Sequence, residues 1–134
     1  MMRFTEITEP AISQLVDRFY AKVRRDTVIG PIFNAAIDDW DEHLAKLKDF
    51  WSSVMLTTGR YKGNPMARHM AQPIEPPFFD HWLALWRETV AEMFTPEIAA
   101  RFAEKAERIG ESLKLALFFH PDDARLHRGG SNGA

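Results

Sequence analysis

Apolar residues recur at intervals of three and four positions along most of the chain, as they do on one face of an amphipathic helix. No segment shows the strict alternation and flanking turn signals of a β-hairpin. The pattern therefore predicts an all-α fold. Its long helices are expected from Glu9 to about Val23, from about Asp39 to Thr58, from about Phe78 to Phe94, and from Pro96 to about Leu117.

Residues at the expected helix starts agree with these positions. Thr8 precedes Glu9-Pro10 and Thr95 precedes Pro96, and both are favourable helix entries. Asp39, with an acid three residues later, resembles a capping residue and its reciprocal partner. The apolar faces that follow are Ile12, Leu15, Val16, Phe19 and Val23; then His43, Leu47, Phe50, Trp51 and Val54; then Phe79, Trp82, Leu83, Trp86, Val90 and Met93; and finally Ile98, Phe102, Ala106, Ile109, Leu113 and Leu117.

Two segments interrupt the helical pattern. Gly30-Pro31 ends the first helical run, and Ile32-Phe33 begins a short apolar turn. The segment from Asn64 to Pro77 holds four of the eight prolines. Proline removes a backbone donor and disfavours helix in the residue before it, so at most one or two helical turns fit there, and these contain His69.

The length of 134 residues predicts one domain, with a core or an enclosed ligand. We expect this domain to span residues 1–119. Residues 120–134 hold three of the seven glycines and show no apolar period, so they are expected to form a flexible tail.

Charge and composition exclude several classes of protein. The formal net charge of −2 gives no support to nucleic-acid binding. The absence of cysteine excludes disulfides, iron–sulfur clusters and thiolate zinc sites. No signal-peptide core and no apolar run of membrane-spanning length is present, so we expect a cytoplasmic protein that does not bind membranes.

Two histidines are candidate ligands in different settings. His43 shares a helix face with Leu47 and Phe50, where an imidazole needs a partner for its polar nitrogens. His69 lies among small and apolar residues between prolines, where the backbone would be well fixed. Each also has an ordinary interpretation, because His43 could be a hydrogen-bonded helix residue and His69 an exposed loop residue.

Tyr20 and a pair of tryptophans complete the set of candidates. Tyr20 lies at the edge of an apolar face, and a buried tyrosine needs a partner for its hydroxyl. Trp82 and Trp86 are four residues apart on one helix, and such pairs are usually core. An indole N–H that pointed into a cavity would instead be a fixed donor with no acceptor capacity.

In this order, the residues resemble the truncated haemoglobins, most closely those of group III. The resemblance covers about Phe4 to Phe119. Groups I and II typically carry paired glycines between helices, whereas the only such pair here is Gly129-Gly130 in the tail. The stretches that carry the resemblance are FYAKVRRDTVIGPIFNAAI, WDEHLAKLKDFWSSVML and RYKGNPMARHMAQPIEPPFFDHWLALW.

The resemblance implies a shortened globin fold, a two-over-two helical sandwich around haem b (iron protoporphyrin IX). His69 would be the proximal iron ligand. Tyr20, His43 and Trp82 would lie on the distal side, where ligands bind. The walls of the haem pocket would be Phe33, Leu47, Phe50, Trp51, Leu83 and Trp86, and Lys46 or Arg68 would pair with a propionate.

The implied ligands are the diatomic gases O2, NO and CO. A tyrosine hydroxyl and an indole N–H near such a ligand would each contribute on the order of 1–3 kcal/mol and slow its release. This favours oxygen, nitric oxide or peroxide redox chemistry, or sensing, over bulk oxygen delivery. It leaves open a nitric oxide dioxygenase or a peroxidase-like activity, with an unknown reductase as partner. We expect the chain to be a monomer or a weak dimer.

Two other classes of protein remain as alternatives. One is a non-haem metal-binding helical enzyme that uses His43, His69 and His81, although the chain lacks the Glu-x-x-His arrangement of di-iron bundles. The other is a structural helical interaction domain in which Tyr20, Trp82 and the histidines are ordinary core or surface residues.

Overall fold

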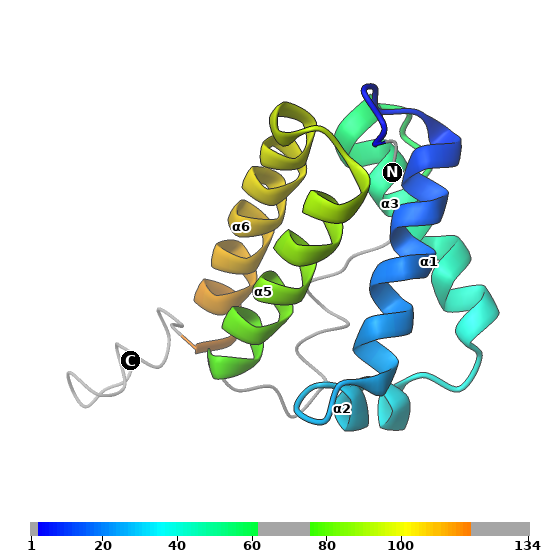
Figure 1. The fold of residues 1–134 in the computed structure, drawn as a ribbon. Coiled ribbons are helices and arrows are strands. Elements are labelled where there is room, and N and C mark those ends of the chain that lie inside the picture. The colour runs from blue at the N-terminus through cyan, green and yellow to red at the C-terminus, as the bar shows by residue number, and fades with distance from the viewer. Residues whose placement is uncertain (1–2, 62–75, 119–134) are drawn as a thin grey trace.

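The computed structural model describes residues 3–61 and 76–118, and helices account for most of them (Figure 1). They are α1 (Glu9–Arg25), α2 (Gly30–Ala36), α3 (Trp40–Leu56), α5 (Pro76–Met93) and α6 (Pro96–Phe118). Within the described residues, β-type pairing is limited to an isolated bridge between Phe4 and Phe94. The prediction of an all-α fold is confirmed.

The long helices form two pairs. Figure 1 shows α5 and α6 side by side and antiparallel, with α1 and α3 making up the other pair and α2 crossing at one end. Ser52 near the end of α3 donates to Glu9 at the start of α1, whereas Lys48, earlier in α3, pairs with Asp17, later in α1. The two helices of this pair are therefore antiparallel as well. The predicted two-over-two arrangement is present.

The helix starts follow the capping residues of the sequence. The Thr8 hydroxyl accepts from the amide of Ala11, and the Asp39 carboxylate accepts from the amide of Glu42. At its other end, α3 stops two residues before the expected Thr58. Thr57 adopts a left-handed conformation, with φ of 58°, and so ends the helix at Leu56.

The segment after α1 differs from the expected short turn, because Gly30-Pro31 begins the helix α2. Proline suits the first turn of a helix, where its missing N–H has no intrahelical partner. A β-carbon at Gly30 would lie 2.9 Å from the carbonyl oxygen of Val23, so glycine lets α2 start directly against α1. Helix α1 has already ended at Arg25, so the dipeptide begins α2 and does not itself end α1.

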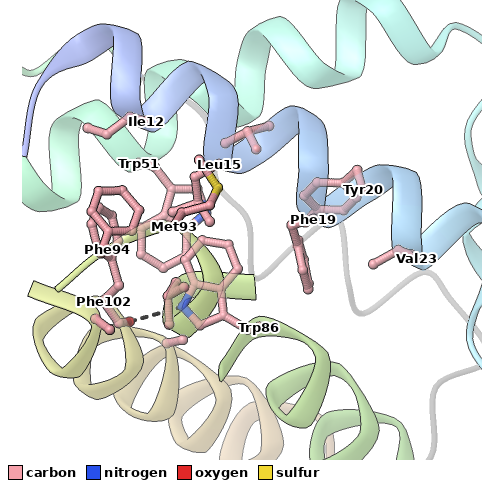
Figure 2. Close-up of a cluster of buried hydrophobic side chains, with 14 of the residues drawn as sticks. Ile12, Leu15, Phe19, Tyr20, Val23, Trp51, Trp86, Met93, Phe94 and Phe102 are labelled. Atoms are coloured by element: carbon pink, nitrogen blue, oxygen red, sulfur yellow. Dashed lines mark hydrogen bonds between the residues drawn. The ribbon is translucent and has the colours of Figure 1, made fainter. Parts of the chain in front are cut away.

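The hydrophobic core lies between the two helix pairs, and Figure 2 shows its aromatic centre. The indole of Trp86 is fully buried and stacks on Trp51, with ring centroids 4.4 Å apart. Its N–H donates to the carbonyl of Phe102 in α6, at 3.1 Å. The predicted inner face of α1 is buried as expected and comprises Ile12, Leu15, Val16, Phe19 and Val23.

Several predictions concern parts of the chain outside the described residues. These are the proximal ligand His69, the propionate partner Arg68, the proline-bracketed turn around them, and the tail at residues 120–134. In the two described ranges, no helix is both long enough and apolar enough to cross a lipid bilayer.

Candidate functional site

Tyr20 is the centre of a cluster of aromatic side chains at the end of α1 that meets α2. Its side chain is only 5% exposed. Its ring lies 5.8 Å from that of Phe33 in α2, 6.1 Å from Trp40 and 6.2 Å from His43, both in α3. Three helices thus bring together two predicted ligand-site residues, Tyr20 and His43, and one predicted pocket residue, Phe33.

The third predicted distal residue, Trp82 in α5, forms a side-chain hydrogen bond with Tyr20. Because an indole nitrogen can only donate, Trp82 donates to the Tyr20 oxygen. Burial raises the pKa of the Tyr20 hydroxyl well above its ordinary value, and the bond from Trp82 offsets this only in part. The hydroxyl therefore keeps its proton at neutral pH. Because Trp82 supplies the hydrogen of the bond between the two residues, the Tyr20 proton is not engaged in that bond.

Phe33 is also packed by α5. Phe78 in the first turn of α5 stacks on Phe33, with centroids 5.6 Å apart and an interplanar angle of 26°. His81 of α5 lies 2.7 Å from Asp26, whose carboxylate also accepts from the amides of Val28 and Ile29. The turn before α2 is therefore fixed to α5, which holds Phe33 in place.

These contacts at Asp26 change the acidity of its carboxyl. Partial burial alone would raise its pKa, but the bonds from His81 and from the two backbone amides outweigh this effect, and the pKa is lowered. Asp26 is therefore ionised at neutral pH. The alternative non-haem metal site would use His43, His69 and His81. In the structure, His81 pairs with the Asp26 carboxylate instead.

Partly buried apolar side chains follow His43 along α3, and α5 carries another. Leu47 and Phe50 of α3 and Leu83 of α5 pack against the core but stay half-buried. Only Trp51 and Ser52 of the whole of α3 are fully buried. Half-exposed apolar side chains beside a few polar groups are typical of a ligand-binding surface. Together with the hydroxyl, imidazole and indole donors, this surface fits a flat apolar group such as haem.

The remaining predicted pocket residues lie elsewhere. Trp51 and Trp86 belong to the fully buried core, where they stack on each other, so their contact with a cofactor stays a prediction. Lys46 is exposed and lies 4.0 Å from Glu42, one turn earlier on the same helix. Its role as a propionate partner also stays a prediction. In residues 3–61 and 76–118, no group of three histidine or acidic side chains could hold a metal ion.

Two members of the cluster were not identified from the sequence. Trp40 lies three residues before His43 on α3, and Phe78 lies four residues before Trp82 on α5. Both spacings place a residue on the same helix face as its partner, so the helical period contained the signal. The period does not show how the helices cross, so it could not predict that both rings would meet the Tyr20 cluster.

Comparisons with known proteins agree with this fold. Residues 4–114 match the model of the family described as bacterial-like globin. The chain belongs to this family of globins, which supports haem binding, and globins bind small diatomic gases at haem.

Similarity within the family is to group III truncated haemoglobins. The group 3 truncated haemoglobin of Campylobacter jejuni is 35% identical over 122 residues, which are 87% of this chain and 96% of the relative. The crystal structure of the group III truncated haemoglobin from Campylobacter jejuni superposes with a TM-score of 0.84, covering 88% of this chain and 97% of the other. The resemblance predicted from the sequence is confirmed.

Proposed function

We propose that this chain binds haem b through His69 and uses Tyr20, with Trp82 and His43, to control a diatomic ligand at the iron. The observation that carries the proposal is the buried, protonated hydroxyl of Tyr20, which accepts a bond from Trp82 next to the ring of His43. His69 enters through its match to the proximal histidine of the truncated haemoglobins.

Bound haem supplies an iron centre that takes up small gases and exchanges electrons. The residues of the chain provide the surroundings. Phe33, Leu47, Phe50 and Leu83 offer apolar contact and exclude water, while the Tyr20 hydroxyl offers a proton to a polar ligand. A buried donor of this kind retains oxygen, which supports redox chemistry or sensing rather than delivery.

The first experiment is absorption spectroscopy of the purified protein with added haemin. A Soret band is expected, and its absence would refute haem binding. His69→Ala should reduce haem retention far more than His43→Ala. His81→Gln is the matched control, because the glutamine amide can still donate to Asp26, and this variant should retain haem like the unmodified protein.

The role of His43 decides which chemistry is open to the site. If His43 acts on the ligand and not on the iron, the ferric protein is high-spin near neutral pH. A low-spin spectrum of bis-histidine type that disappears in His43→Ala would show that His43 binds the iron itself. Turnover of nitric oxide in the presence of oxygen and a reductant, compared with peroxidase turnover, then separates the two enzymatic activities.

A further inference from the structure

Trp40 lies against both Tyr20 and His43. It is the first residue of α3, directly after the capping residue Asp39, so the start of the capped helix fixes its backbone. Its indole meets the His43 ring edge-on, with centroids 5.6 Å apart, and lies 6.1 Å from Tyr20. The indole is half-buried, whereas Tyr20 beneath it is buried.

An arginine lies on the outer face of this indole. The guanidinium carbon of Arg24, in the last turn of α1, is 4.6 Å from the centroid of the Trp40 ring. The Arg24 side chain is exposed, and its backbone carbonyl accepts from the side chain of Asn34 in α2. The order from solvent inward is therefore an exposed cation, a half-buried indole and a buried hydroxyl.

We propose that Trp40, held by Arg24, is the residue that determines ligand access to the Tyr20–His43 side of the site. This inference rests on the proposed function. The indole restricts the path between solvent and the Tyr20 hydroxyl, and its bulk sets the size of ligand that enters quickly. A cation–π contact at an exposed site is weak, so the indole can move aside without unfolding α3.

The test uses haem-loaded protein and two ligands of different size, carbon monoxide and tert-butyl isocyanide, mixed rapidly with the ferrous form. Trp40→Ala is expected to raise the association rate of the isocyanide more than that of carbon monoxide, and Trp40→Phe should restore most of the restriction. Arg24→Met keeps the aliphatic stem but removes the cation, and should raise the isocyanide rate about two- to fivefold. Arg25→Met is the matched control, since Arg25 is an exposed neighbour for which the structure shows no ring contact, and it should leave both rates unchanged.

A second readout is independent of ligand binding. Carbethoxylation of His43 by diethyl pyrocarbonate, followed by peptide mass spectrometry, should be faster in Trp40→Ala and Arg24→Met than in Arg25→Met. Unchanged isocyanide rates and unchanged labelling in haem-loaded Arg24→Met and Trp40→Ala would overturn the inference but leave the proposed function standing. If Trp40→Ala fails to fold, Arg24→Met decides alone. A wild-type protein without a Soret band would overturn both.

Discussion

The hydrogen bond from Trp82 to Tyr20 predicts that Trp82 acts on a bound ligand through Tyr20 and not directly. Tyr20→Phe keeps the ring and its packing but removes the proton available to the ligand. A hydrogen bond to a charged or strongly polarised partner contributes about 1.5–3 kcal/mol, so the oxygen dissociation rate should rise roughly 10- to 150-fold. Trp82→Phe removes only the polarisation of the hydroxyl, which accounts for about 10–30% of that energy. The oxygen dissociation rate should therefore rise at most about fivefold in this variant.

The double variant distinguishes action of Trp82 through Tyr20 from direct action of Trp82 on the ligand. If Trp82 acts through Tyr20, Trp82→Phe has almost no further effect once Tyr20→Phe is in place. The assay is displacement of oxygen by carbon monoxide in a stopped-flow instrument, with the four proteins measured together. Additive effects, with Trp82→Phe still raising the rate more than about fivefold in the Tyr20→Phe background, would refute this reasoning and show that the indole reaches the ligand itself.

The remaining predictions concern stability. Asp26→Ala removes the acceptor of two backbone amides and should lower the free energy of unfolding by about 1–2 kcal/mol, with Asp26→Asn losing less because it can still accept. Because the pKa of Asp26 is lowered in the folded state, its contribution to stability is present above the unfolded pKa of about 3.9 and is lost as pH falls through the folded pKa. In urea unfolding from pH 7 to pH 3, the difference in free energy of unfolding between the unmodified protein and Asp26→Ala should shrink. A constant difference would contradict this. Trp86→Phe removes the donor to the Phe102 carbonyl and should cost about 1–3 kcal/mol in the same assay, whereas an unchanged midpoint would show that the bond contributes little.

Most of the fold was predictable because periodicity and capping act locally. The α1 face from Ile12 to Val23 and the cap at Asp39 follow from positions within one helix, and both are present. The helix α2 was not predicted. Its start depends on the close approach of Gly30 to α1 and on the acceptor Asp26, and neither is visible from the apolar pattern.

The candidate site was predictable in its residue types more than in their contacts. Tyr20 and His43 lie on inward faces, and the helix crossing brings their rings together. The indoles of Trp82 and Trp86 have identical spacing signals but different partners, Tyr20 for one and a backbone carbonyl for the other. Which indole donates to which acceptor depends on packing between helices, so periodicity could not distinguish them.

The bridge between Phe4 and Phe94 has a consequence for the order in which the chain folds. The amide of Phe4 donates to Met93 and its carbonyl accepts from Thr95, so the segment before α1 is bound to the turn that joins α5 and α6. Helices α5 and α6 are neighbours in the chain and can pair early, whereas contacts between distant positions must overcome the entropy of closing a long loop. We therefore expect the N-terminal segment to add late, so that removing it accelerates unfolding and leaves the folding rate almost unchanged in stopped-flow urea jumps.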